Sequence, residues 1–170
     1  IAASEAAAAV TATRPARRLR VGLAWAGNPR NVNDRRRSID AARFAPLLDV
    51  AGIAWYSLQR AVDEGAMQDL PAAAALTRLP LRDDFEGMAA LVAGMDLVIS
   101  VDTSIAHLAG ALARPAWLLL PYAFDWRWQQ HRTDSPWYPT LRLFRQPVRG
   151  DWGSVIAAVR EALVSLVAER

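Results

Sequence analysis

The sequence VISVDTSIAHLAGA, residues 98–111, decides the fold of this chain. Its first residues are apolar and mostly β-branched, which predicts a buried strand. Asp102, Thr103 and Ser104 follow, and a run of small helix-forming residues begins directly after them. A strand that runs into a helix with almost no loop places these polar residues at the carboxyl end of a strand and the amino end of a helix. In open α/β sheets ligands bind at this edge, and the free N–H groups of a helix start favour a phosphate or another anion.

The alternation of apolar strands and helices extends over most of the chain. We expect strands at residues 20–26, 53–58, 76–81, 97–101, 115–120 and 141–145, and helices at residues 40–49, 64–70, 84–94, 104–113 and 152–167. The helix at 40–49 is predicted to be capped by Asp40 and the last one by Asp151. Continuous apolar strands between helices predict the α/β class, with a Rossmann-like open parallel sheet of five to six strands and helices on both faces. Residues 1–18 are predicted to be a linker or helix end and residues 19–168 the folded domain.

Composition limits the classes of protein that this chain can be. Its 170 residues suffice for one domain, and with 53% hydrophobic and 22% charged residues it has the composition of a soluble globular protein. The absence of cysteine excludes disulfides and is compatible with the cytoplasm, which is the location we expect. No apolar run is long enough to span a membrane. The pI of 10.1 arises because every basic residue is arginine, but these arginines are scattered and acids are interleaved with them, so no nucleic-acid partner is expected.

The first candidate site combines Asp102, Thr103 and Ser104 with His107. Thr103 and His107 are one helical turn apart and therefore share a face of the predicted helix. Backbone N–H groups at the helix start could hold a diphosphate, and Asp102 could accept hydrogen bonds from the hydroxyl groups of a sugar or ribose. The alternative is that these residues only cap the helix, with His107 packed against the sheet.

A second candidate site follows the first strand. Gly27 and Asn28 lead into the cluster Arg35-Arg36-Arg37, in which an arginine could neutralise a departing phosphate. The segment lacks the glycine-rich fingerprint of dinucleotide-binding domains and the phosphate-binding loop of nucleoside triphosphatases. The alternative is an exposed, solvated loop.

The third candidate is the aromatic stretch FDWRW, residues 124–128, with DSPWYP, residues 134–139. Such residues suit sugar stacking or contact with a partner domain, although simple packing is the competing interpretation. Two histidines without cysteine cannot make a closed structural zinc site of the usual kind. No D-x-D pair stands at a strand end either, so a metal-bound nucleotide sugar is not expected. We expect no metal and no cofactor.

These motifs carry a family resemblance. Residues 79–81, 85–94 and 98–109 resemble the donor-binding half of the heptosyltransferases. The D-W-R-W, D-S-P-W-Y-P and L-F-R-Q segments are similar to the C-terminal region of bacterial tetratricopeptide-repeat glycosyltransferases, distant relatives of the O-linked N-acetylglucosamine transferases. The resemblance runs from about residue 20 to residue 165. It implies one half of a GT-B fold and transfer from a nucleoside diphosphate sugar without a metal.

The resemblance also implies roles for single residues. Asp102, Thr103 and Ser104 would contact the diphosphate and sugar, with His107 nearby. Gly27 and Asn28 would lie near the phosphates, and Arg37 falls close to a lysine that binds the leaving phosphate in the heptosyltransferases. Gln59 and Leu81 match positions near the ribose and base.

The length of the chain leaves room for one Rossmann-like domain only. The expected partners are therefore an N-terminal GT-B half, which would supply the acceptor site and catalytic base, and possibly tetratricopeptide repeats. The sequence leaves the sugar, the base and the acceptor open. A non-catalytic nucleotide-binding or protein-interaction module is the alternative, and an oxidoreductase or epimerase is disfavoured because the glycine fingerprint is absent.

Overall fold

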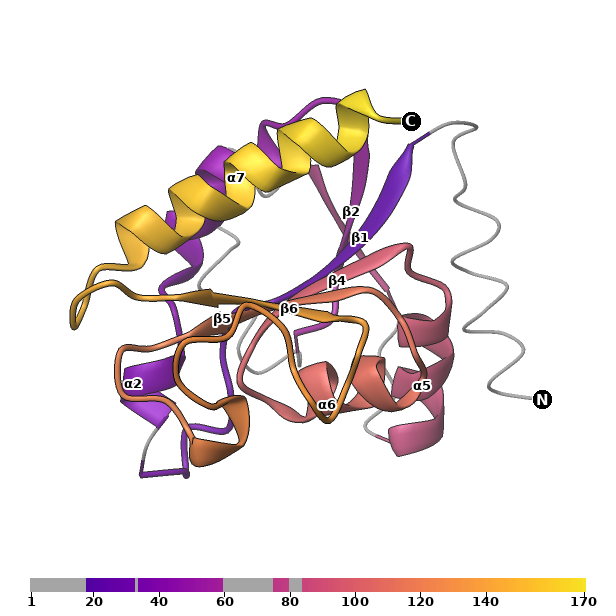
Figure 1. Ribbon diagram of the computed structural model, residues 1–170. Helices are drawn as coiled ribbons and strands as arrows, with labels where there is room; N and C mark the ends of the chain where they lie inside the picture. Colours follow the sequence, from indigo (N-terminus) through magenta and orange to yellow (C-terminus); the bar gives the residue numbers. More distant parts are fainter. Residues whose placement is uncertain (1–17, 33, 60–74, 80–83) are drawn as a thin grey trace.

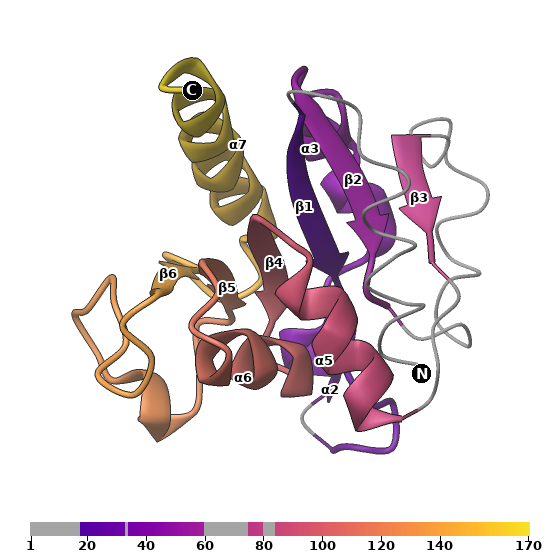
Figure 2. The same ribbon diagram turned by 90° about the vertical axis from the view of Figure 1, so that its right-hand side faces the viewer.

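A single six-stranded parallel sheet forms the centre of the molecule. The computed structural model describes residues 18–32, 34–59, 75–79 and 84–170. The sheet has the order β3-β2-β1-β4-β5-β6 and every neighbouring pair is parallel (Figures 1 and 2). The strands are β1 (Leu19–Ala24), β2 (Ile53–Ser57), β3 (Leu76–Arg78), β4 (Leu97–Val101), β5 (Ala116–Leu120) and β6 (Leu141–Arg145). The predicted fold class is thereby confirmed, with six strands.

Helices cover both faces of the sheet, as the apolar strands require. Side chains of successive strand residues point to opposite faces, so Leu97, Ile99 and Val101 belong to one core and Val98 to the other. The first core lies under η1 (Ala41–Phe44), α3 (Ala45–Leu48) and α7 (Trp152–Ala168). The second lies under α5 (Phe85–Ala93) and α6 (Ser104–Ala111), on the opposite side in Figure 1.

Two expected helix caps are present. Asp40 accepts a hydrogen bond from the N–H of Ala42 at 2.9 Å, and Asp151 accepts one from the N–H of Ser154 at 3.0 Å. The helix expected at 40–49 is nevertheless divided into η1 and α3. Pro46 stands in the first turn of α3, and a proline has no N–H with which to continue the hydrogen bonding of the preceding turn.

Other helices and strands end at residues different from those predicted. The first strand ends at residue 24 and not 26, and α6 ends at Ala111, after which Ala113 adopts a left-handed conformation with φ of 52°. The third strand is described over Leu76–Arg78, while residues 80–81 and the helix expected at 64–70 lie outside the described residues. The prediction for residues 1–18 falls almost entirely outside them as well.

Phe85 is an exception in the packing of α5. Helical spacing places it on one face with Met88, Leu91 and Val92, but its side chain is 70% exposed. It is the first residue of α5 and directly follows the cap Asp84. The helix therefore buries its later turns and presents Phe85 outward.

The sheet order places a crevice between β1 and β4. From β1 the chain continues to η1 and α3 on one face, whereas from β4 it continues to α6 on the other (Figure 2). The connections diverge at this point, where the strand order reverses, and such a switch point is the usual ligand site of open α/β sheets. No helix within the described residues is both long and apolar enough to cross a membrane.

Candidate functional site

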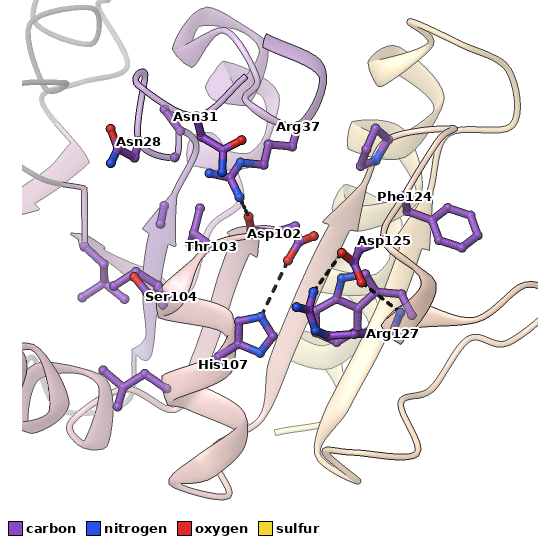
Figure 3. A pocket seen from close by; sticks show the side chains of 18 of the residues that line it. Asn28, Asn31, Arg37, Asp102, Thr103, Ser104, His107, Phe124, Asp125 and Arg127 are labelled. Atoms are coloured by element: carbon purple, nitrogen blue, oxygen red, sulfur yellow. Dashed lines mark hydrogen bonds and ion pairs between the residues drawn. The ribbon is translucent and has the colours of Figure 1, made fainter. Parts of the chain in front are cut away.

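A pocket of about 1690 Å³ opens at the carboxyl ends of β1 and β4. The turn after β1 and the short helix α2 (Asp34–Arg37) form one wall, and the start of α6 lies beneath them. The segment 121–128 with Trp137 and Tyr138 forms the opposite wall. Figure 3 shows Asn31 and Arg37 on one side of Asp102 and His107 on the other. The pocket thus brings all three candidate regions of the sequence together.

The start of α6 carries no capping side chain. Thr103 occupies the N-cap position in an extended conformation, but its hydroxyl lies 3.1 Å from the hydroxyl of Ser100. Ser100 donates its own proton to the backbone oxygen of Val101 at 2.8 Å, so Thr103 must donate to Ser100. The interpretation of Thr103 as a simple side-chain cap is therefore wrong. The first residues of α6 line the pocket, no side chain caps the first N–H groups of the helix, and Ser104 is exposed.

His107 lies one turn into α6 among three other side chains. Its Nε2 is 3.9 Å from a carboxylate oxygen of Asp102, and its Nδ1 is 3.2 Å from the hydroxyl of Tyr138. The imidazole stacks on Trp128, with ring centroids 5.3 Å apart and planes inclined by 27°. The side chain retains 36% exposure and lines the pocket, so it is not a core histidine packed against the sheet.

Arg37 connects the two candidate phosphate-binding segments, the one after β1 and the one after β4. Its Nε donates to a carboxylate oxygen of the buried Asp34 at 3.3 Å, and its Nη1 donates to the backbone oxygen of Asp102 at 2.9 Å. The alternative of an exposed loop does not hold for residues 34–37, which form α2, although Arg35 and Arg36 are exposed. Arg36 also lines the pocket, whereas Arg35 does not.

Gly27 makes room for this arrangement. A Cβ atom at residue 27 would lie 2.4 Å from Oδ1 of Asp34 and 2.7 Å from Nη2 of Arg37. The N–H of Gly27 donates to the hydroxyl of Ser38 at 3.0 Å. The next residue, Asn28, is exposed on the pocket wall, and its side-chain oxygen accepts from the N–H of Arg30 at 3.0 Å. Both residues therefore shape the turn that carries the guanidinium to the pocket.

Gln59 lines the pocket but is only 3% exposed. Its Oε1 accepts from the N–H groups of Trp25 and Ala26 at 3.0 and 2.9 Å, and its Nε2 donates to the oxygen of Ala26 at 3.1 Å. These bonds replace strand pairing after residue 24, which explains why β1 ends early. Contact of Gln59 with a ribose or base stays a prediction, and Leu81 lies outside the described residues.

The aromatic wall divides into a buried and an exposed part. Trp128 is fully buried, as the packing interpretation predicted, but Trp126 and Trp137 are 72% and 55% exposed at the rim. These two indoles meet edge to face, with centroids 6.5 Å apart. Arg127 is paired with Asp125 at 2.8 Å and lies over the ring of Trp126. The rim therefore combines two aromatic surfaces with an ion pair.

Arg145 of β6 holds this wall in place. Its Nη2 donates to the backbone oxygens of Trp128 and Gln129, and its guanidinium lies 4.5 Å from the ring centroid of Phe124. Burial lowers the pKa of Arg145 below its usual value. Gln129 has a φ of 47°, a left-handed value that is unusual for a residue with a side chain. The charge thus stabilises a loop conformation that the local sequence does not favour.

Some of these roles could not be read from the sequence. Tyr138 belongs to the aromatic segment, but its partner His107 lies 31 residues away and no local pattern connects them. The same holds for Gln59, whose partners lie 33 and 34 residues away. It also holds for Arg145, whose partners lie 16 and 17 residues away. Among the described residues, no group of three His, Asp or Glu side chains is placed to hold a metal ion.

Residues 59–119 match the model of glycosyltransferase family 9 (heptosyltransferase). The chain is also 29% identical over 150 residues to Protein FlbA of Caulobacter vibrioides, an alignment that covers 85% of this chain and 25% of FlbA.

Solved structures show the same fold. The E. coli ADP-heptose LPS heptosyltransferase II superposes with a TM-score of 0.70 at 16% identity, covering 99% of this chain and 51% of that one. The E. coli heptosyltransferase WaaC with ADP-2-deoxy-2-fluoro heptose has a TM-score of 0.64 at 19% identity, with 94% and 47% covered. A family 9 glycosyl transferase from Veillonella parvula has a TM-score of 0.66 at 14% identity, with 99% and 51% covered. The chain therefore spans about half the length of these enzymes and a quarter of FlbA, and its sheet is that of the heptosyltransferase GT-B fold.

Proposed function

We propose that this domain binds the nucleoside diphosphate sugar used by a metal-independent glycosyltransferase. The observation that carries the proposal is the position of Arg37 beside the uncapped start of α6, at the switch point between β1 and β4. A helix start carries about half a positive charge, and a guanidinium pairs with two phosphate oxygens at once. Together they form a preorganised site for the charge that develops on a departing diphosphate.

The other residues of the pocket complete this assignment. Asp102 is a hydrogen-bond acceptor directly beside the helix start, which suits the hydroxyl groups of a sugar or ribose. Gly27 and Asn28 shape the turn near the phosphates, and Ser104 is an exposed hydroxyl next to the first N–H groups. Gln59 acts on the ligand through the loop that it holds. Leu81 retains its proposed place near the base.

The relatives support the class of ligand. WaaC was solved with ADP and with ADP-2-deoxy-2-fluoro heptose, in a fold that this chain shares at 19% identity. We propose that an N-terminal GT-B half supplies the acceptor site and the catalytic base, that tetratricopeptide repeats belong to the same bacterial protein, and that it acts in the cytoplasm.

Nucleotide binding tests this function directly. The domain is titrated with ADP, UDP, GDP and CMP, with and without EDTA, and thermal unfolding is recorded. A ligand at about 100 times its dissociation constant should stabilise the domain by about 2.7 kcal/mol, and EDTA should leave that effect unchanged. If none of the four nucleotides raises the melting temperature, the proposal is wrong.

A double variant locates the binding site. Asp102→Ala with Thr103→Ala should abolish the shift, because it removes both side chains at the helix start. Thr133→Ala with Asp134→Ala is the matched control, since this adjacent exposed pair does not line the pocket. Equal affinity of the two double variants would place the nucleotide elsewhere.

A binding module without transferase activity is the second candidate. The exposed Trp126 and Trp137 at the rim favour it, because such aromatic surfaces also suit contact with another protein. Joining the domain to an N-terminal GT-B half distinguishes the two. Sugar transfer by the joined protein supports the first candidate, whereas nucleotide binding without transfer supports the second.

A further inference from the structure

His107 is held so that each ring nitrogen faces a different partner. The hydroxyl of Tyr138 lies 3.2 Å from Nδ1, and a carboxylate oxygen of Asp102 lies 3.9 Å from Nε2. Trp128 supports one face of the ring at 5.3 Å. In Figure 3 the imidazole points from α6 towards Asp102 in the middle of the pocket. The ring therefore has one defined orientation, with the Nε2 edge towards the proposed ligand.

We propose that Tyr138 is a positioning residue that fixes the neutral His107 ring as the Nε2–H tautomer. His107 then offers a hydrogen-bond donor, and not a lone pair, to a phosphate or sugar oxygen beside Asp102. The identity of that oxygen rests on the proposed function, whereas the tautomer does not depend on it.

The position of the single imidazole proton decides which contacts of His107 are attractive. A neutral imidazole has one N–H and one lone pair. With the proton on Nδ1, the lone pair of Nε2 would face the negative carboxylate of Asp102, which is electrostatically unfavourable. With the proton on Nε2, its N–H dipole points towards that carboxylate, and Nδ1 accepts from the Tyr138 hydroxyl. Only the second arrangement makes both contacts attractive.

Tyr138 is rigid enough to impose this choice. Its ring packs directly on α6, where a Cβ atom at Gly110 would lie 2.4 Å from the Cγ of Tyr138. Its N–H donates to the hydroxyl of the buried Ser135 at 3.3 Å. Its backbone oxygen accepts from Leu141, the first residue of β6, at 3.0 Å. The phenol is thus anchored to a strand and a helix, and its hydroxyl reaches Nδ1 without a rearrangement.

The tautomer determines what His107 can do in the pocket. An imidazole that presents Nε2–H binds an anionic oxygen and stabilises it, but it cannot remove a proton from an acceptor through that nitrogen. His107 therefore joins Arg37 and the start of α6 as a donor to the diphosphate sugar. The general base of the transfer must then be a different residue.

Nitrogen-15 NMR spectra of the imidazoles measure the tautomer directly. The chain has two histidines, and His131 is exposed outside the pocket, so His131→Gln assigns the signals and serves as the control. With the rings neutral, His107 should be almost entirely Nε2–H in the unaltered protein and a mixture of tautomers in Tyr138→Phe. A merely structural Tyr138 would leave the tautomer unchanged. A predominant Nδ1–H form in the unaltered protein would refute the inference.

A pair of substitutions tests the donor itself. The amide nitrogen of Gln lies near the position of Nε2, and that of Asn near Nδ1. With the nucleoside diphosphate that binds best among ADP, UDP and GDP, His107→Gln should bind within about threefold of the unaltered domain. His107→Asn should bind about tenfold more weakly or worse.

The outcomes separate this inference from the proposed function. Equal losses in the two variants would contradict the donor role, even when the tautomer is as expected. If no diphosphate binds the unaltered domain, the proposed function fails, and the NMR spectra still decide whether Tyr138 sets the tautomer. Near-identical circular dichroism of Tyr138→Phe and the parent domain is the check on folding.

Discussion

The Nη1 of Arg37 donates a 2.9 Å hydrogen bond to the backbone oxygen of Asp102, across 65 residues of sequence. This bond joins the segment after β1 to the end of β4, the two strands between which the sheet order reverses. Asp34 holds the same guanidinium from the other side at 3.3 Å. The positive charge is thereby fixed beside the start of α6 before any ligand arrives, which lowers the entropic cost of binding an anion there.

Replacement of Arg37 should weaken nucleotide binding specifically. In Arg37→Gln, we expect an affinity for the nucleoside diphosphate about tenfold lower or worse, because a charge-assisted contact to phosphate is lost. Arg35→Gln is the matched control, since Arg35 lies on the same short helix, is exposed and does not line the pocket. Isothermal titration calorimetry measures both variants. Equal losses would mean that only the overall charge matters.

A methyl group at Gly27 should have a similar effect without removing any charge. The added Cβ would lie 2.4 Å from Oδ1 of Asp34 and 2.7 Å from Nη2 of Arg37, so the guanidinium must move away from Asp102. We expect Gly27→Ala to weaken nucleotide binding while the domain stays folded. At Gly153 in α7 the nearest atom is 3.5 Å away, and Gly153→Ala should keep full affinity. Unchanged binding in Gly27→Ala would show that Arg37 need not stay in place.

The sequence predicted the parts of this molecule that local patterns determine. Four of the six strands, β1, β2, β4 and β5, are largely apolar runs, and the caps Asp40 and Asp151 stand directly before their helices. The triplet at residues 102–104 was predicted at the carboxyl edge of the sheet because strand, polar residues and helix follow one another without a gap. In each of these cases the interaction lies within a few residues of the pattern that predicts it.

The parts that the sequence missed depend on distant contacts. The early end of β1 depends on Gln59, and the orientation of His107 on Tyr138. Phe85 has the spacing of a core residue but is exposed at the start of α5, which periodicity cannot show. Thr103 is of a residue type that often caps helices, yet its hydroxyl donates a hydrogen bond to the hydroxyl of Ser100. The competition among partners for one polar group becomes visible only in three dimensions.

Gln59 should contribute more to stability than a typical polar residue. In Gln59→Leu, the N–H groups of Trp25 and Ala26 lose their acceptor in a buried position, which we expect to cost about 2 to 4 kcal/mol. Gln130→Leu, at an exposed position, should change the free energy of unfolding by about 0.5 kcal/mol or less. Urea unfolding gives both values. A loss as small as that of the control would mean that water replaces the amide.

The ion pair of Arg20 with Asp96 predicts how stability changes in acid. Burial alone would raise the pKa of Asp96, but hydrogen bonds from the side chain and backbone of Arg20 outweigh it and hold that pKa below its usual value. The pair joins the amino ends of β1 and β4, and its bonds to Nε and Nη2 are 3.1 and 2.7 Å long. It therefore acts far from the pocket and should affect stability alone.

Because the folded protein depresses this pKa, the ionised carboxylate stabilises the fold above the unfolded value of about 3.9, and the contribution disappears as the pH falls through the lower folded pKa. At pH 7, Asp96→Asn should lower the free energy of unfolding by about 1 to 2 kcal/mol. The difference from the unaltered protein should shrink below about pH 4 in urea unfolding measured at successive pH values. Asp134→Asn, which breaks the exposed pair with Arg132, is the control and should have little effect at any pH. A difference for Asp96→Asn that stays constant into strong acid would show that the packing of this residue, and not its charge, supports the fold.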